Sequence, residues 1–221
     1  MSIITSKISR IRPLNEMPIK SSGDYILYWM TSARRFHYNA GMDRAIELAI
    51  ELEKPVLVVE CMSIRHDWAN ERILAFSVQG MLDNIKVFEE NNITYLPWVE
   101  THKDSGNKLL AKLSSHACSV ITDDYPTYLP RTVMERAAKI CEVRTEAADS
   151  NGILPMAWAG KEHMTAYSFR KHVQKSMADA LLNLPRKNSM DGISVNLRFD
   201  RKEMESLFAA VEVKFTPLEW L

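Results

Sequence analysis

The stretch Asp24-Tyr-Ile-Leu-Tyr-Trp-Met30 is the first of five short apolar runs that recur along the chain. Runs of this length, rich in β-branched and aromatic residues, are typical of buried strands. Every run except the last precedes a stretch with helical periodicity, which predicts an α/β fold: a three-layer sandwich around a five-stranded parallel sheet. The other runs are Pro55-Val-Leu-Val-Val-Glu60, Ile93-Thr-Tyr-Leu-Pro-Trp-Val-Glu100, Cys118-Ser-Val-Ile-Thr-Asp-Asp124 and Val143-Arg-Thr-Glu-Ala-Ala-Asp149.

Polar side chains collect where these runs end. Arg34 and Arg35 follow the first run, Glu60 closes the second, and Asp123 and Asp124 close the fourth. The carboxyl ends of parallel strands border the ligand crevice of an open sheet. We therefore expect these side chains to surround a bound small molecule.

The segment after the first run admits two interpretations. Met30, Arg34, Arg35 and Asn39 lie where the strand leads into its helix, and they could contact a ligand or an adjacent domain. They could equally form a solvated loop, with Asn39 near the helix N-cap. Both interpretations stay open on the sequence alone.

The paired carboxylates are also ambiguous. Asp123-Asp124 precede Tyr125-Pro126, a context in which an aspartate often forms an Asx turn. We expect one of the two to shape that turn and the other to accept hydrogen bonds from the ligand. The sequence does not say which is which.

Composition limits the classes of function. The 28 basic residues balance 28 acidic ones, so the chain as a whole has no electrostatic preference for nucleic acid. Locally, residues 1–20 carry four basic side chains against one acidic, and residues 161–187 carry six against two. Such segments either contact phosphate or form solvated faces.

Glycine is scarce. The chain has seven glycines and no G-x-G, so the dinucleotide fingerprint and the Walker loop are missing. The usual modes of ATP or NAD binding are therefore disfavoured. Acidic strand ends suit an uncharged, ring-bearing or ribityl ligand better than a triphosphate.

Metal, disulfide and membrane signals are lacking in the sequence. The three cysteines are widely spaced and resemble buried thiols of a reducing, cytoplasmic compartment. The histidines show no H-x-x-x-H spacing, so we expect no metal site. No apolar run approaches the roughly 18 residues of a membrane span, so no membrane partner is expected.

We expect three segments: a basic extended arm over 1–22, an α/β domain over 23–160 and a helical extension or linker over 161–221. Trp68, Trp98 and Trp158 lie near strands and helix starts and are expected to be core residues rather than an electron relay. Helices are predicted over 38–52, 70–91, 105–115, 130–141, 165–184 and 201–211. The predicted apolar stripe of the 165–184 helix consists of Ala166, Phe169, Val173, Met177, Ala180 and Leu184.

Several short motifs, taken in order, resemble the opening α/β domain of the DNA photolyase/cryptochrome family, class II type. Each is weak alone, but they extend over about residues 25–184. The matching motifs are Tyr28-Trp29-Met30, Arg34-Arg35, Asn39-Ala40, Glu60, Trp68, Arg72, Phe76, Gly80-Met-Leu-Asp-Asn84, Ile93-Thr-Tyr-Leu-Pro-Trp-Val-Glu100, Val120-Ile-Thr-Asp-Asp-Tyr-Pro126 and Asp149-Ser-Asn-Gly-Ile-Leu-Pro155.

The resemblance implies a Rossmann-like domain that holds an antenna chromophore, an 8-hydroxy-deazaflavin or a folate. The residues expected to bind it are Met30, Arg34, Arg35, Asn39, Glu60, Asp123 and Asp124. In the family, a later all-helical domain binds FAD and the cyclobutane pyrimidine dimer. We expect that domain to be absent here and to be the partner of this chain, in cis or in trans, with damaged DNA reached only indirectly.

On this interpretation, deoxyribodipyrimidine photo-lyase activity belongs to a longer protein, and the isolated chain has no catalytic residues of its own. Two alternatives remain. The first is a stand-alone module of the same fold that binds a nucleotide-like ligand or a protein. The second, which ranks last because no nucleophile accompanies them, is a self-contained enzyme acting through Asp123 and Asp124.

Overall fold

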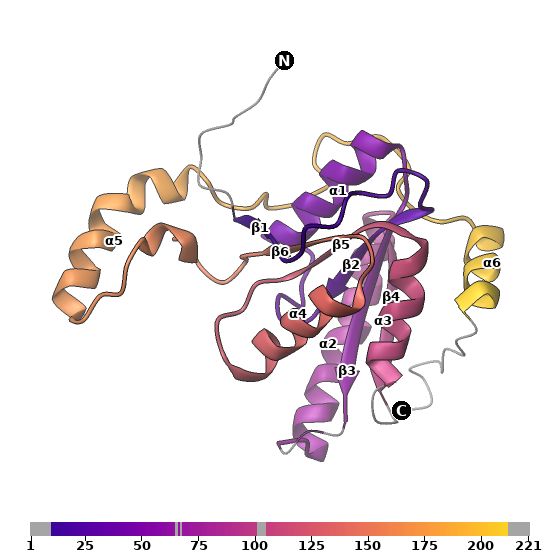
Figure 1. The fold of residues 1–221 in the computed structure, drawn as a ribbon, viewed down its shortest axis with the longest axis horizontal. Coiled ribbons are helices and arrows are strands. Elements are labelled where there is room, and N and C mark those ends of the chain that lie inside the picture. The colour runs from indigo at the N-terminus through magenta and orange to yellow at the C-terminus, as the bar shows by residue number, and fades with distance from the viewer. Residues whose placement is uncertain (1–9, 65, 67, 101–104, 212–221) are drawn as a thin grey trace.

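The computed structural model describes residues 10–64, 66, 68–100 and 105–211, and in this part of the chain a six-stranded sheet carries helices on both faces (Figure 1). The strand order is β1-β6-β5-β2-β3-β4. All neighbouring pairs from β6 to β4 are parallel, so the predicted five-stranded parallel sheet is confirmed. The strands are β1 (Ile11–Pro13), β2 (Tyr25–Met30), β3 (Val56–Ser63), β4 (Thr94–Glu100), β5 (Ala117–Asp123) and β6 (Arg144–Ala148).

The predicted number of strands is wrong by one, because the sequence analysis misses β1. This strand pairs antiparallel with β6, with Ile11 opposite Ala148 and Pro13 opposite Glu146. It has three residues and ends on a proline, which cannot donate to a strand ladder, so no apolar alternation reveals it. The described part of the predicted arm therefore forms one edge of the sheet. Residues 1–9 of that arm lie outside the described residues.

The helices form the two outer layers of the predicted sandwich. Helices α1 and α2 pack on one face, and α3, α4 and α6 pack on the other. Their bounds agree with the predicted ones to within a few residues. The helices are α1 (Ala40–Leu52), α2 (Glu71–Glu90), α3 (Ser105–His116), α4 (Tyr128–Ile140), α5 (Ala166–Leu181) and α6 (Arg201–Val211), with a 3₁₀ turn η1 (Met156–Ala159) before α5.

The central strand β2 shows why the sheet needs both layers. All six of its residues are buried. Tyr28 and its alternate neighbours pack under α1, whereas Tyr25, Leu27 and Trp29 face the core beneath α3 and α4. A parallel strand covered on both faces has no polar side, which explains its continuous apolar sequence.

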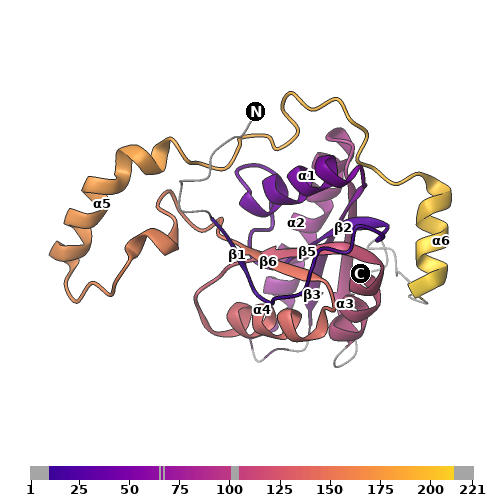
Figure 2. The ribbon, with the colours of Figure 1, turned by 45° about the horizontal axis from the view of Figure 1, so that its top comes forward.

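Residues 186–207 wrap around the amino ends of the strands, and Figure 2 shows this segment passing over α1 toward α6. The carbonyl of Leu197 accepts the backbone N–H of Val56 at 2.9 Å, and Leu197 itself is buried. Phe199 makes an edge-to-face contact with Tyr25 at 5.5 Å between ring centroids, and Leu207 of α6 is buried in the same core. Leu197, Phe199 and Leu207, which fall in the segment predicted as an extension, thus pack into the core of the sheet.

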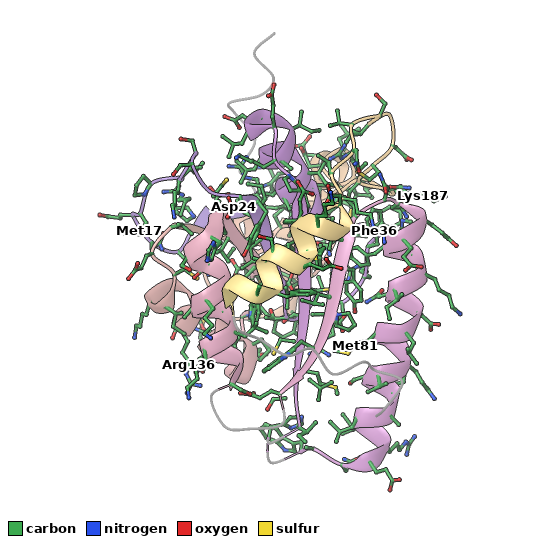
Figure 3. All side chains as sticks on the ribbon, turned by 90° about the vertical axis from the view of Figure 1, so that its right-hand side faces the viewer. Met17, Asp24, Phe36, Met81, Arg136 and Lys187 are labelled. Atoms are coloured by element: carbon green, nitrogen blue, oxygen red, sulfur yellow. The ribbon has the colours of Figure 1, made fainter. Side chains whose placement is uncertain are left out.

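Figure 3 shows the molecule from the side of α6, with α3 and α2 to either side of it. Asp24 marks the amino end of β2, and Arg136 on α4 and Met81 on α2 lie nearer to the opposite end of the sheet. That opposite end is where β3 and β4 lead into α2 and α3. It is the end at which the sequence predicts a ligand.

Helix α5 projects from the body of the molecule (Figure 1). Of its predicted apolar stripe, Ala180 is buried, but Phe169 is 47% exposed. Trp68 is also not a core residue as predicted, because it is 67% exposed. In both cases the position of the residue, on a helix or beside a strand, does not predict its burial. Burial depends on which other elements of the fold cover the side chain.

Candidate functional site: the carboxyl ends of the strands

The strand order reverses between β2 and β5, and Asp123 occupies that point. Its Oδ2 accepts hydrogen bonds from the backbone N–H groups of Thr31, Ser32 and Ala33 at 2.8, 2.7 and 3.0 Å. Its Oδ1 accepts the hydroxyl of Tyr28 at 2.6 Å. The residue is 2% exposed. This carboxylate therefore anchors the loop after β2 to the end of β5.

Asn39 extends the same network to α1. Its side-chain oxygen accepts the N–H groups of Gly41 and Met42 at 2.9 and 3.1 Å, which makes it the N-cap of α1. Its amide nitrogen donates to the Tyr28 hydroxyl at 3.0 Å and to the carbonyl of Arg35 at 2.7 Å. The side chain is fully buried and holds the loop in place from the helix side.

The hydrogen bonds that Asp123 accepts affect which ligands the turn after β2 can bind. A cluster of backbone N–H groups at a strand-to-helix turn is where a Rossmann-type sheet binds phosphate. Here the carboxylate of Asp123 accepts those N–H groups. A phosphate would have to displace a buried, hydrogen-bonded carboxylate, so this turn disfavours nucleotides.

Glu60 forms a second buried network within β3, opposite Met30 at the end of β2. It does not close its strand as predicted, because β3 continues to Ser63 in pairing with β4. Its Oε2 accepts the Tyr95 hydroxyl at 2.6 Å and the Asn84 amide at 2.9 Å. Its Oε1 lies 3.5 Å from the guanidinium of Arg34, whose Nη2 also donates to the carbonyl of Cys61 at 3.3 Å. Glu60 is 1% exposed, and it holds Arg34 over the end of the sheet.

The remaining predicted residues have other surroundings. Met30 is fully buried in the core under α1. Arg35 donates to the carbonyls of His37, Tyr38 and Ser150 and so connects its loop to the segment after β6.

Asp124 forms a two-pronged ion pair with Arg12 of β1, at 2.5 and 2.9 Å. It lines a shallow hollow of about 610 Å³ together with Arg12, Arg131 and Glu135. Arg131 and Glu135 are themselves paired at 2.9 Å, and Lys139 adds one further positive charge to the lining.

A cavity of about 520 Å³ opens at the carboxyl ends of β2, β3 and β4, between α2, α3 and α4. Of the seven predicted residues, Arg34 lines it. Its volume lies within the range of sites for small molecules and cofactors, which are mostly apolar with a few polar groups. The apolar part of the lining comes from Trp29, Met62, Ile73, Leu74, Leu110, Pro130 and Val133.

The polar groups of this cavity have mixed charge. Arg34 and Arg136 supply positive charge, and Glu100 at the end of β4 supplies negative charge. Glu100 also accepts the backbone N–H of Gly106 at the start of α3 at 3.1 Å. Nδ1 of His66 is shielded from solvent and has no hydrogen-bond partner among the described residues. A ligand with polar ring substituents would satisfy that nitrogen, because buried polar atoms are seldom left unpaired.

Cys61 also lines the cavity but is not a nucleophile. Burial, together with the nearby Glu100 carboxylate, raises the pKa of its thiol to about 12. A thiol with a raised pKa is protonated at neutral pH and reacts slowly. The lining is thus suited to binding a largely apolar molecule, and the Cys61 thiol is not activated for covalent chemistry.

Sequence reasoning missed most of this lining. Glu100 could have been found, because it ends the third run just as Glu60 ends the second. The helix residues Leu110, Val133 and Arg136 carried no such signal, since their positions depend on how α3 and α4 pack on the sheet. Among the described residues, no three His, Cys, Asp or Glu side chains lie close enough to hold a metal ion, and no helix is long and apolar enough to cross a membrane.

Three buried tyrosines should lower the free energy of unfolding at alkaline pH. Burial raises the pKa of Tyr28 and Tyr95 above the usual value, with further increases from Asp123 and Glu60 respectively, and burial likewise raises the pKa of Tyr25. In the unfolded chain these hydroxyls ionise near pH 10. Above that pH the unfolded state releases protons that the folded state keeps, so stability is complete below pH ~10 and falls above it.

The expected slope is about 1.4 kcal/mol per pH unit for each tyrosine, or about 4 kcal/mol per unit for all three. Urea unfolding between about pH 9 and 11 measures it. Tyr28→Phe should make the slope shallower by about one third, whereas Tyr125→Phe, at a position that is 37% exposed, should leave it unchanged. An unfolding free energy that stays constant to pH ~11 would contradict this account of the buried hydroxyls.

The structure is that of an open α/β sheet protein with a cavity at the strand ends, and a curated protein resembles the chain in sequence. The chain is 28% identical over 187 residues to a deoxyribodipyrimidine photo-lyase of Methanothermobacter thermautotrophicus (strain Delta H). The match covers 82% of this chain and 41% of the relative, so the chain spans about two fifths of the length of the curated relative it matches. No family model matches the chain. The similarity supports a relationship to photolyases.

Proposed function

We propose that this chain is an antenna domain of the class II photolyase type and that it binds one 8-hydroxy-deazaflavin or folate chromophore. The observation that carries the proposal is the cavity at the carboxyl ends of β2, β3 and β4, in a chain similar to a photolyase. When bound, such a chromophore absorbs light and passes its excitation to a flavin held elsewhere.

The residues of the cavity support this ligand class. Trp29, Leu110 and Val133 offer apolar surface to a fused ring, and Arg34, Arg136 and His66 offer polar contacts for ring substituents. Asp123 and Asn39 act differently, as positioning residues. They fix the loop that carries Arg34 and have no contact with the cavity themselves.

We further propose that the partner is an FAD-binding helical domain, in cis or in trans, and that repair of cyclobutane pyrimidine dimers belongs to the two together. A surface for such a partner is available beside the cavity. Trp68 in the turn before α2, and Ile73 and Phe76 in its first turns, are 67%, 43% and 75% exposed, and Ile73 also lines the cavity. Adjacent exposed apolar side chains of this size usually mark an interaction surface.

A fluorescence and absorbance titration tests the antenna proposal. We expect the purified chain to bind 8-hydroxy-5-deazariboflavin or methenyltetrahydrofolate with 1:1 stoichiometry and a Kd of about 1 µM or lower. Titration with ATP and AMP tests the alternative, in which the chain is a module that binds nucleotides. Tight binding of either nucleotide, with uptake of neither chromophore, would replace the antenna proposal by that alternative.

A further inference from the structure

Helix α5 presents a basic surface, with one acidic side chain, the exposed Asp179, in its last turn. From His163 to Ala178 the chain has three basic residues, Arg170, Lys171 and Lys175, and no aspartate or glutamate. All three are exposed. None of them pairs with a carboxylate of the described residues. Their charge is therefore available to an external anion.

These side chains share one side of the helix. With 100° between successive residues, Tyr167, Arg170, Lys171, Gln174 and Lys175 fall within one exposed arc, which we call the α5 basic face. The Lys171 ammonium lies 5.0 Å and the Arg170 guanidinium 5.7 Å from the centroid of the Tyr167 ring. Such cation–π contacts hold the two charges in a defined arrangement over the ring.

We propose that the α5 basic face binds the phosphate backbone of duplex DNA without reading its sequence. Lys171 and Lys175 are one turn apart, a rise of about 6 Å. Phosphates two steps apart on one DNA strand are separated by about 6.8 Å along the axis, so the two ammonium groups can reach alternate phosphates. The helix projects from the body of the molecule, which leaves this face accessible to a long ligand (Figure 2).

An anionic membrane surface fits less well. A helix that lies in a membrane interface needs an exposed apolar face between its basic flanks. On α5 the side opposite the basic face carries Val173 and Met177, which are partly buried, and Ala180, which is fully buried. Phe169 on that side is 47% exposed, but Val173, Met177 and Ala180 are not exposed, so α5 offers no continuous apolar face to a membrane.

This inference goes beyond the antenna proposal, in which DNA is reached only through the partner domain, and it does not use the cavity. The test is fluorescence anisotropy with a labelled duplex of about 20 base pairs, at salt concentrations from about 50 to 200 mM. The variant combines Arg170→Gln, Lys171→Gln and Lys175→Gln. We expect its Kd to rise roughly tenfold or more at the lowest salt, and the slope of log K against log salt to become shallower by about 2.7, or about 0.9 for each lost phosphate contact.

The matched control combines Lys86→Gln, Lys108→Gln and Lys139→Gln, which remove the same charge from exposed positions on α2, α3 and α4. We expect this control, and Arg170→Lys alone, to bind DNA nearly as well as the parent chain. Equal weakening in the two triple variants, affinity that is independent of salt, or binding to phosphatidylserine vesicles but not to duplex would overturn the proposal. Chromophore uptake should be the same in all variants, so the DNA result leaves the antenna proposal to its own test.

Discussion

Replacing Asp123 by alanine should lower the free energy of unfolding by about 3–5 kcal/mol. The substitution leaves three backbone N–H groups and the Tyr28 hydroxyl without their acceptor in a site that is 2% exposed. Buried donors without partners each cost about 1–3 kcal/mol, and water entering the space would recover part of that loss. A small domain has only about 5–15 kcal/mol of stability in total, so the effect should be large.

Asp124 provides the control for this experiment because it is the next residue and has the same side chain. Its carboxylate, in a side chain that is 12% exposed, pairs with the Arg12 side chain, which is 50% exposed, and a pair that solvent reaches from one side contributes about 1 kcal/mol. Asp124→Ala should therefore cost little. Urea unfolding followed by tryptophan fluorescence compares the two variants. Equal, small losses would show that the Asp123 network does not hold the loop.

Replacing Ser77 by tryptophan should weaken chromophore binding by about 100-fold or more, which corresponds to about 2.7 kcal/mol. Ser77 lines the cavity from α2, and its hydroxyl is engaged with the carbonyl of Ile73 at 3.0 Å. An indole at this position would occupy the space that we assign to the chromophore. Because the cavity is open to solvent on one side, we expect the fold to tolerate the larger side chain with a change of about 1 kcal/mol or less.

Ser115→Trp is the matched control for the cavity experiment. Ser115 is exposed on α3, makes a similar local hydrogen bond to the carbonyl of Lys112 at 2.8 Å, and does not line the cavity. We expect its chromophore affinity to equal that of the parent chain. If Ser77→Trp also binds like the parent, the chromophore site lies elsewhere on the molecule.

The sheet could be predicted from the sequence because its parallel strands are buried on both faces and so appear as continuous apolar runs. β1 could not, because its pairing depends on β6 and its own three residues show no pattern. The packing of residues 186–207 around the strands could not be predicted for a similar reason. Leu197 and Phe199 alternate with polar residues in a segment that forms no strand, and their burial becomes visible only when the amino ends of the strands are in place.

The site shows a second limit of sequence reasoning. The rule that polar residues at strand ends border a crevice pointed to the end of the sheet where the cavity opens. It did not distinguish side chains that line the cavity from side chains that hold the loop. Asp123 ends β5 as expected and Glu60 lies within β3, yet their oxygens accept hydrogen bonds from Ser32 and Tyr95 within the chain. Whether such a side chain faces a ligand or holds the loop depends on the path of the loop after β2, and periodicity carries no information on that path.

The central claim is that the cavity between α2, α3 and α4 is a chromophore site. A crystal structure of the chain grown with 8-hydroxy-5-deazariboflavin tests it most directly. The account predicts electron density for the fused ring between Trp29 and Leu110, with its polar edge within hydrogen-bonding distance of Arg34 or His66. Density for the ring at another place on the molecule, with this cavity filled only by water, would contradict the claim.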